Sequence, residues 1–190
     1  MKLGIDEVGK GEALGPLIIV GIAIADDFCM PVFRDSKVAS PTELTRAIEF
    51  IKKHNLKIFI EKIEPPELDA NNLNTLLQLR VIKLIKESGA TIVYADSPFN
   101  TPLKYGERLA SATNTTVFAA NRLDETNSLV ALASLYAKTI RKEFIDFHDR
   151  KVIGSGNLND IITLKFIKAN PNSSLIRKKW IRNLKNRKFS

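Results

Sequence analysis

Apolar runs separated by short polar turns follow one another along the chain, and their periods predict an α/β domain. The runs at 17–25, 57–63, 91–95 and 115–120 are rich in β-branched residues and predict strands. Apolar residues at helical spacing predict helices at 41–54, 71–88, 103–111, 127–150, 160–169 and 175–186. Strands that alternate with helices in this order indicate a central sheet with helices packed on it.

Several helix and strand ends carry specific signals. Ser40 before Pro41, with Glu43 three residues after Ser40, predicts a capping box at the start of a helix. Gly89 predicts the end of the helix that precedes it. The pair Pro65-Pro66 is interpreted as the end of a strand.

Charge changes this picture at the C-terminus. The 190-residue chain carries a formal net charge of +8, which favours a polyanionic partner. No Asp or Glu occurs from residue 161 to residue 190, where the basic residues are Lys165, Lys168, Arg177, Lys178, Lys179, Arg182, Lys185, Arg187 and Lys188. We interpret this segment as a basic helix that faces phosphates, although an ordinary solvated helix would have the same composition.

The remaining composition excludes several classes of protein. The single cysteine, Cys29, rules out an intramolecular disulfide and is expected to be a small buried side chain. No signal peptide or membrane-spanning run is visible, so a cytoplasmic location is expected. The two histidines and one cysteine are widely scattered, which argues against a zinc site.

The first residues of the chain carry the strongest chemical signal. Asp6 and Glu7 end an apolar run and precede a glycine-rich turn, which predicts a hairpin with acids at the end of its first strand. Neighbouring side chains of a strand point to opposite faces, so one of these acids must face the body of the protein. A buried carboxylate is costly unless a cation lies beside it.

The turn after these acids suits an anionic ligand. Gly9 and Gly11 lack a Cβ, so backbone N–H groups there can approach a phosphate or sugar closely, and Lys10 adds positive charge. The segment is neither a Walker A loop nor a dinucleotide-binding fingerprint. Further acids follow two later strands: Asp96 after 91–95, and Asp124 or Glu125 after 115–120.

Taken together, these motifs resemble type 2 ribonuclease H (ribonuclease HII), in its compact archaeal form, over nearly the whole chain. The segment from Gly4 to Gly11 is similar to the opening motif of the family, and Ala133 to Lys138 is similar to a helix motif that places the fourth acid at Asp124. Other matching segments are Asp35-Ser36-Lys37, Asn72-Leu73-Asn74, Tyr94-Ala95-Asp96, Gly154-Ser155-Gly156, Asp160 with Thr163, and Arg177-Lys178-Lys179-Trp180.

This resemblance implies a ribonuclease-H-like fold, a mixed sheet flanked by helices, with a catalytic domain at 1–150 and a basic helical extension at 151–190. It implies hydrolysis of the RNA strand of RNA–DNA hybrids, leaving 5′-phosphate and 3′-hydroxyl ends. Two Mg²⁺ or Mn²⁺ ions about 4 Å apart would assist this reaction, held by the catalytic acids Asp6, Glu7, Asp96 and Asp124. The implied substrate-binding residues are Gly9, Lys10, Gly11, Asp35, Ser36, Lys37, Asn74, Ser134, Lys138, Asn157, Arg177, Lys178 and Lys179.

Two positions depart from the family pattern. Asn157 stands where the family carries a tyrosine that stacks on the sugar at an RNA–DNA junction, and an amide has no aromatic face. Lys10 replaces the usual arginine, and so a point charge replaces a planar fork. Both features are similar to type 3 ribonuclease H (ribonuclease HIII), so a preference for long hybrids without junction recognition is one alternative.

A non-catalytic nucleic-acid-binding protein on the same fold is a second alternative, although it would not need four acids at matching positions. Another nuclease or recombinase of this fold is a third, and the Gly-Lys-Gly and Asp-Ser-Lys motifs argue against it. We expect a monomer that binds a hybrid duplex, with no membrane and no small-molecule cofactor involved.

Overall fold

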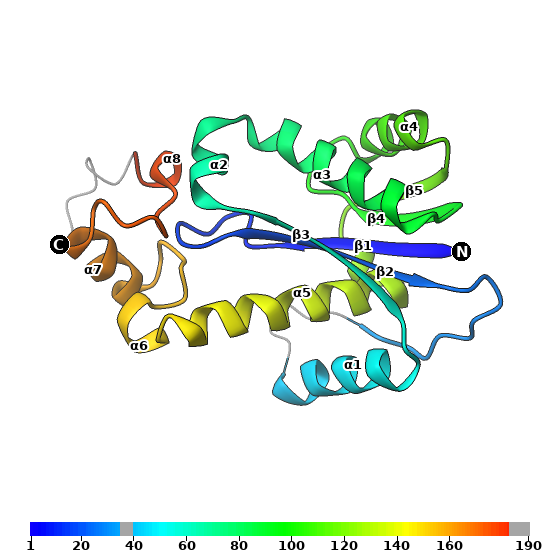
Figure 1. The fold of residues 1–190 in the computed structure, drawn as a ribbon, viewed down its shortest axis with the longest axis horizontal. Coiled ribbons are helices and arrows are strands. Elements are labelled where there is room, and N and C mark those ends of the chain that lie inside the picture. The colour runs from blue at the N-terminus through cyan, green and yellow to red at the C-terminus, as the bar shows by residue number, and fades with distance from the viewer. Residues whose placement is uncertain (35–39, 183–190) are drawn as a thin grey trace.

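The computed structural model describes residues 1–34 and 40–182, and Figure 1 shows their arrangement as a central sheet with helices on both faces. The strands are β1 (Lys2–Val8), β2 (Leu17–Ile24), β3 (Lys57–Ile63), β4 (Ile92–Asp96) and β5 (Thr116–Ala120). The helices are α1 (Pro41–Lys53), α2 (Pro65–Ala70), α3 (Leu73–Ser88), α4 (Pro102–Thr113), the 3₁₀ turn η1 (Leu123–Glu125), α5 (Ser128–Phe147), α6 (Arg150–Ile153), α7 (Ile161–Ala169) and α8 (Lys178–Ile181).

The five strands form one mixed sheet in the order β3-β2-β1-β4-β5. Strand β2 pairs antiparallel with both β1 and β3, whereas β4 pairs parallel with both β1 and β5. The hairpin predicted from the first residues is therefore confirmed, and β1 occupies the middle of the sheet. Because β1, β4 and β5 are parallel, their C-terminal ends lie at the same edge of the sheet.

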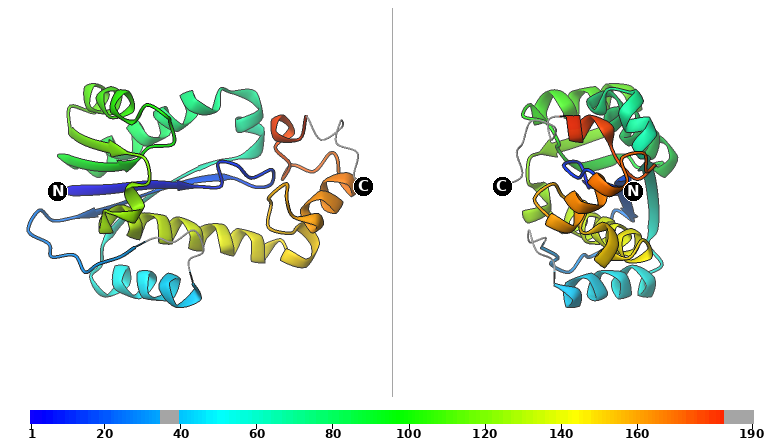
Figure 2. Two further views of the ribbon diagram at one scale, coloured as in Figure 1. Left: turned by 180° about the vertical axis from the view of Figure 1, so that it is seen from behind. Right: turned by 90° about the vertical axis from the view of Figure 1, so that its left-hand side faces the viewer.

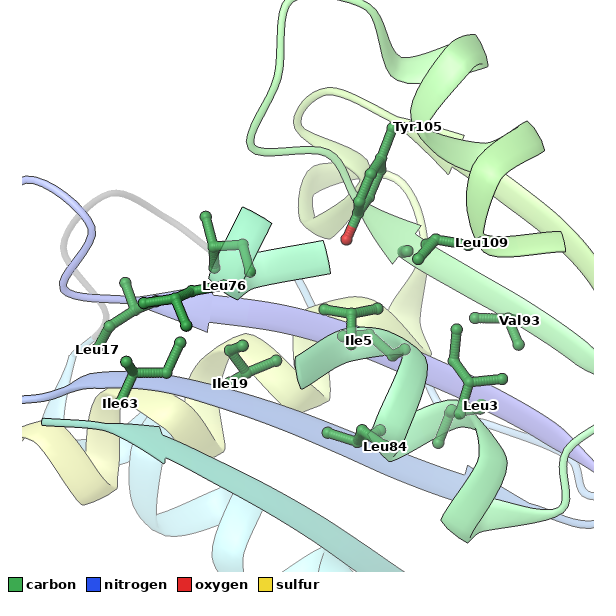
Figure 3. Packing of buried hydrophobic residues seen from close by; sticks show 14 of the residues in the cluster. Leu3, Ile5, Leu17, Ile19, Ile63, Leu76, Leu84, Val93, Tyr105 and Leu109 are labelled. Carbon is green, nitrogen blue, oxygen red and sulfur yellow. The ribbon is translucent and has the colours of Figure 1, made fainter. Parts of the chain in front are cut away.

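Helices cover both faces of this sheet, each over its own apolar layer (Figure 2). One layer packs α3 and α4 against inward-facing residues such as Leu3, Ile5 and Ile19, and Figure 3 shows these side chains from close by. The other layer packs α1 and α5 against Ile18, Val20 and their neighbours. Strand β2 contributes to both layers, which is why all eight of its residues are buried.

The predicted capping signals are confirmed. The Ser40 hydroxyl accepts from the N–H of Glu43 at 3.2 Å, and the Glu43 carboxylate accepts from the N–H of Ser40 at 2.8 Å. These bonds satisfy donors that the first turn of α1 would otherwise leave unpaired. Gly89 ends α3 in the left-handed conformation, with φ of 64°.

The predicted end of a strand at Pro65-Pro66 is confirmed, since β3 ends at Ile63, but Pro65 also begins the short helix α2, which was not predicted. Two other predicted details are wrong. The long helix ends at Phe147 instead of Arg150, because Asp149 adopts a positive φ of 58° before the short turn α6. Cys29 is exposed and not buried.

The last described helix, α8, begins at Lys178 and not at Leu175. The residues before it are extended because Ile176 forms a β-bridge with Leu14, and the Leu175 carbonyl accepts from the N–H of Gly15 at 2.8 Å. The predicted helix end at residue 186 and the Asp35-Ser36-Lys37 motif both lie outside the described residues. Helices α6, α7 and α8 gather beside the β1–β2 turn (Figure 1).

Candidate active site

The acid cluster, defined as Asp6, Glu7, Asp96 and Asp124, lies where the parallel strands end. Ile5 on β1 is paired with Ala95 on β4, so the next residues, Asp6 and Asp96, follow on neighbouring strands. Asp124 belongs to the 3₁₀ turn η1, which follows β5. The sheet topology therefore brings together acids from distant parts of the sequence.

Asp6 is the most buried member of the cluster, with 6% of its surface exposed. Its carboxylate accepts the N–H of Glu7 at 2.8 Å and a hydrogen bond from the Ser134 hydroxyl of α5. Burial, reinforced by the charges of Glu7 and Asp96, raises the pKa of Asp6 well above its ordinary value. The prediction that one of the two adjacent acids faces the protein body is confirmed.

The pKa values of Glu7 and Asp96 are shifted in the same direction. Burial, followed by the negative charge of Asp96, raises the pKa of Glu7 to about 8, although Lys10 opposes the shift. Burial raises the pKa of Asp96 to about 6, against a 2.6 Å hydrogen bond from the N–H of Leu123, and the charge of Asp124 adds to the rise. A cation among these groups would relieve both their burial and their mutual repulsion.

The donor set suits a hard divalent cation, since carboxylate oxygens are the ligands that Mg²⁺ and Mn²⁺ prefer. Within residues 1–34 and 40–182, no three His, Cys, Asp or Glu side chains already surround a common ion position. A hard cation held there by one or two carboxylates would complete its coordination with water. Because carboxylates bind metal ions in their deprotonated form, such binding would lower the raised pKa values of Glu7 and Asp96.

Tyr105 on α4 is a neighbour of the acid cluster. Only 3% of its surface is exposed, so it offers no aromatic face to a ligand. Burial, followed by the charges of Glu7, Asp96 and Asp6, raises the pKa of its hydroxyl. Figure 3 shows Tyr105 reaching from α4 with its hydroxyl pointing toward the strands.

The glycine loop, residues 9–16, connects β1 to β2 beside the acid cluster. Gly9 has a φ of 87° and Gly15 a φ of 77°, values that favour glycine. Gly11 is exposed, and a Cβ there would meet nothing within 4 Å, so the fold itself does not require glycine at this position. The Lys10 ammonium donates to the Pro98 carbonyl and lies 5.7 Å from the centre of the Phe99 ring.

The remaining predicted substrate residues fall into two groups. Ser134 and Lys138 lie one turn apart on α5. Hydrogen bonds from Ser40 lower the pKa of Glu43 on α1, and the charge of the nearby Lys138 contributes to the same shift. Asn74 is exposed in the first turn of α3. Asn157 is half-buried in the loop after α6, and its side-chain oxygen accepts from the N–H of Asn159 at 2.8 Å.

The predicted basic residues Arg177, Lys178 and Lys179 differ in their exposure to solvent. Lys178 and Lys179 are exposed, and the Lys179 ammonium donates to the Asn71 carbonyl at 2.6 Å. Arg177 is fully buried, so the prediction that it belongs to a phosphate-facing surface is wrong. Its guanidinium donates to the carbonyls of Gly15 at 2.7 Å and Gly9 at 2.6 Å, which turns it away from solvent.

Sequence reasoning missed Arg141, which lies beside Arg177. It is buried on α5 and donates to the carbonyls of Pro16 at 3.4 Å and Ser155 at 3.3 Å. Its position, four residues after Ala137 and four before Ile145, places it on the buried stripe of the helix. A charged residue on an apolar stripe was the available signal for a buried, partnered cation.

Comparisons with known proteins agree with this architecture. Residues 3–183 match the model of the family described as ribonuclease HII. The chain is 32% identical to a ribonuclease HII from Archaeoglobus fulgidus, over 95% of this chain and 93% of that protein. It is 34% identical to one from Pyrobaculum aerophilum, over 93% of this chain and 87% of that protein.

Solved structures show the same similarity. The structure of the PCNA:RNase HII complex from Archaeoglobus fulgidus superposes with a TM-score of 0.82 at 31% identity, covering 95% of each chain. A structure of Bst-RNase HIII in complex with Mn²⁺ superposes with a TM-score of 0.65 at 18% identity, covering 98% of this chain and 70% of that one. The second likeness concerns the fold alone.

Proposed function

Since this chain belongs to the ribonuclease HII family of endonucleases, which act on RNA paired with DNA, we propose that it cuts the RNA strand of hybrid duplexes through the acid cluster. The observation that carries this proposal is the convergence of Asp6, Glu7, Asp96 and Asp124. Burial, reinforced by the charges of neighbouring acids, raises the pKa values of the first three. A protein that only bound nucleic acid would gain nothing from placing buried negative charges beside a polyanion.

The acids would hold Mg²⁺ or Mn²⁺, and the Mn²⁺ complex of a ribonuclease HIII with the same fold supports this choice of ion. Two such ions, when bound, supply activation of the attacking water and neutralisation of charge on the leaving 3′ oxygen. Asp6 would be fixed in orientation by the Glu7 N–H and by Ser134, and Asp96 by the Leu123 N–H. The expected products are a 5′-phosphate and a 3′-hydroxyl.

The glycine loop would contact the ribose and phosphate of the RNA strand. Its exposed part, around Gly11, is open to a ligand, because a Cβ there would meet no described residue other than its chain neighbours within 4 Å. A contact to the 2′-hydroxyl is how a protein distinguishes RNA from DNA. Lys10 supports this site indirectly, since its ammonium is held at the Pro98 carbonyl beside the acid cluster.

A second candidate, hybrid cleavage without junction recognition, is favoured by Asn157. Its side chain accepts a hydrogen bond from the N–H of Asn159 and has no aromatic face to stack on a deoxyribose.

We propose five further residues as substrate contacts: Asn74, Ser134, Lys138, Lys178 and Lys179. We also propose that the protein is a monomer with a cytoplasmic location, and that it consists of a catalytic domain at 1–150 and an extension at 151–190. No helix among the described residues is long and apolar enough to span a bilayer.

The test is cleavage of a set of end-labelled duplexes in Mg²⁺ and in Mn²⁺. The set comprises a full RNA–DNA hybrid, DNA with one embedded ribonucleotide, double-stranded RNA and double-stranded DNA. We expect cleavage of the hybrid with 5′-phosphate products, and no cleavage of double-stranded DNA. Hybrid binding without cleavage in either metal would contradict the catalytic proposal and favour the binding-protein alternative.

A further inference from the structure

The C-terminal segment at residues 175–177 pairs with residues 13–15 of the glycine loop. The N–H of Gly15 donates to the Leu175 carbonyl and the N–H of Arg177 to the Ala13 carbonyl, both at 2.8 Å, on either side of the Leu14–Ile176 bridge. Leu14 and Ile176 are buried in the same small apolar cluster. The loop and a segment from the other end of the chain therefore form one packed unit.

Within this unit, one side chain ties the two ends of the loop together. Arg177 donates through Nη1 to the Gly9 carbonyl at 2.6 Å and through Nε to the Gly15 carbonyl at 2.7 Å. A planar guanidinium can make both bonds at once, whereas an ammonium is a point donor on a flexible stem. Hydrogen bonds with a charged donor are also stronger than neutral ones.

A second side chain holds the next peptide group. The Trp180 Nε1–H donates to the Lys10 carbonyl at 3.1 Å, and the Arg177 guanidinium lies 5.2 Å from the centre of the Trp180 ring. The carbonyls of Gly9 and Lys10 therefore both point into the protein. The described residues contain no cis peptide bond, and in a trans peptide the N–H points opposite to the carbonyl. The N–H groups of Lys10 and Gly11 consequently point away from the body of the protein.

Arg141 makes this arrangement costly to change. Burial lowers the pKa of the Arg177 guanidinium, and the nearby charge of Arg141 lowers it further. Arg141 donates its own hydrogen bonds to the Pro16 and Ser155 carbonyls. Glu12 is the acid whose charge offsets both arginines. The carbonyl oxygens of the loop thus surround two buried cations, and a peptide flip would remove one of their acceptors.

We infer that Arg177 and Trp180 are positioning residues for substrate binding: they turn the Gly9 and Lys10 carbonyls inward and so present the Lys10 and Gly11 N–H groups to the RNA strand. This inference rests on the proposed function, because it assigns these N–H groups to the hybrid duplex. It differs from direct phosphate binding by Arg177 itself, which the burial of that side chain excludes.

The variants Trp180→Phe, Arg177→Lys and Arg177→Met test this inference, with Arg80→Met as the matched control. Arg80 is a half-buried arginine whose guanidinium binds the carboxylates of Glu61 and Glu67 instead of carbonyls of the glycine loop. We expect Trp180→Phe and Arg177→Lys to raise KM for the hybrid about tenfold while kcat changes less than about threefold, since each removes a loop-orienting hydrogen bond. Arg80→Met should lower the melting temperature without raising KM.

A second readout does not depend on cleavage. Trp180 is the only tryptophan in the chain, so intrinsic emission reports on its contact with the loop. We expect hybrid duplex to change this emission in the wild type and in the inactive variant Asp96→Asn, and to require higher concentrations in the Arg177→Lys background. Trp180→Phe, which keeps an aromatic ring in place, covers the case in which an Arg177 variant does not fold.

The outcomes separate the two proposals. If the wild type cuts the hybrid and both Trp180→Phe and Arg177→Lys keep KM within about twofold, the positioning inference is overturned and the proposed function stands. If the wild type binds the hybrid without cutting it, the proposed function fails, and the binding curves of the same variants still decide the inference.

Discussion

The described residues include a buried pair of arginines and a cluster of acids, and the two groups differ in whether burial leaves them charged at neutral pH. The arginine pair, Arg141 and Arg177, donates to the carbonyls of Gly9, Gly15, Pro16 and Ser155. Burial, with the charge of Arg141, lowers the pKa of Arg177 to about 9, so the guanidinium stays charged at neutral pH. In the acid cluster, by contrast, burial and the negative charge of Asp96 raise the pKa of Glu7 to about 8, above neutral pH.

This difference separates a structural role from a chemical one. A buried charge that the chain supplies with hydrogen-bond acceptors stabilises one arrangement of the backbone. Arg177 has such acceptors at Nε and Nη1, whereas its buried Nη2 has no hydrogen-bond partner among the described residues. Buried acids that the chain itself does not neutralise retain capacity for an external cation. On this criterion, Arg177 orients the glycine loop, whereas Asp6, Glu7 and Asp96 form the site where chemistry takes place.

The largest effect is expected from Asp96→Asn. The substitution keeps the size of the side chain but removes a metal-ligating charge, and metal charge stabilisation is worth several kcal/mol, so kcat should fall about 1,000-fold or more. Asp6→Asn should behave alike, while hybrid binding by either variant stays largely intact. The measurement is single-turnover cleavage at saturating metal.

The matched control for these variants is Asp146→Asn, because Asp146 is an exposed acid paired with Lys142 on the surface of α5. It should retain wild-type turnover. Near-normal cleavage by Asp96→Asn at saturating metal would remove the acid cluster from the mechanism and abolish the contrast with the arginine pair.

A smaller effect is expected in the pH dependence of stability. The pKa of Glu7 is about 8 in the folded chain against an ordinary value of 4.5, so the folded state holds this proton more tightly. Its contribution to stability is therefore fully present below about pH 4.5 and is lost as pH rises through about 8. Asp6, Asp96, Asp124, Lys10 and Tyr105 are the charged or titratable groups that interact with it.

The corresponding experiment is a series of melting curves from about pH 5 to about pH 8.5 in the presence of a chelator. The melting temperature of the wild type should fall with pH on the order of 5 °C more than that of Glu7→Gln, given the usual conversion of stability into melting temperature. Added Mn²⁺ should reverse the fall in the wild type. Parallel pH profiles for the two proteins would show that Glu7 is not buried among like charges.

These two regions also show what the sequence could predict. Strand and helix periods are local properties, so they predict all five strands and most helices within a few residues of their observed ends. The family resemblance implied that Asp6 and Asp96 share one site, and the parallel pairing of β1 with β4 is the physical reason, because parallel strands end at the same edge of a sheet. Their pKa shifts depend on burial by α4 and α5, which no local pattern contains.

The position of Arg177 could not be predicted for the same reason. In the sequence it stands in a basic run, and such runs are usually solvated. Its burial follows from the bridge between Leu14 and Ile176, a pairing between opposite ends of the chain. The start of α2 at Pro65 was missed because a proline signals the end of a strand and the first turn of a helix equally well.

The neighbours of Arg177 provide the third prediction. Lys178 and Lys179 are exposed, whereas Arg177 is buried. Of these three basic residues, the two lysines are therefore the ones that can reach phosphates. The double variant Lys178→Gln/Lys179→Gln should weaken binding to all duplexes alike. It should also flatten the plot of log affinity against log salt by roughly 0.9 unit for each phosphate that is no longer neutralised.

The control has the same change of net charge. Lys52 and Lys53 are adjacent exposed lysines in the last turn of α1, and Lys52→Gln/Lys53→Gln should leave the salt slope unchanged. Equal slopes of log affinity against log salt for the wild type and both double variants would show that Lys178 and Lys179 do not contact phosphates.

The smallest expected effect belongs to Asn157→Tyr. Asn157 follows Gly156, whose carbonyl accepts from the N–H of Ala13 at 2.8 Å, so its loop is fixed to the glycine loop on the side of the arginine pair. A tyrosine there would stack on the deoxyribose that follows a ribonucleotide, an interaction present only at a junction. Stacking on an aromatic ring is worth about 1–3 kcal/mol for a base, and less for a sugar, so the gain should be roughly fivefold.

We therefore expect the wild type to cut a long hybrid at least as well as a single embedded ribonucleotide, and Asn157→Tyr to shift kcat/KM toward the junction. Asn159→Tyr is the matched control, because it adds the same ring two residues away in the same loop. A wild type that strongly favours the single ribonucleotide would show that another group reads the junction. Tyr105 is too buried for that task, which leaves the half-buried Tyr136 on α5 as the aromatic side chain to replace next.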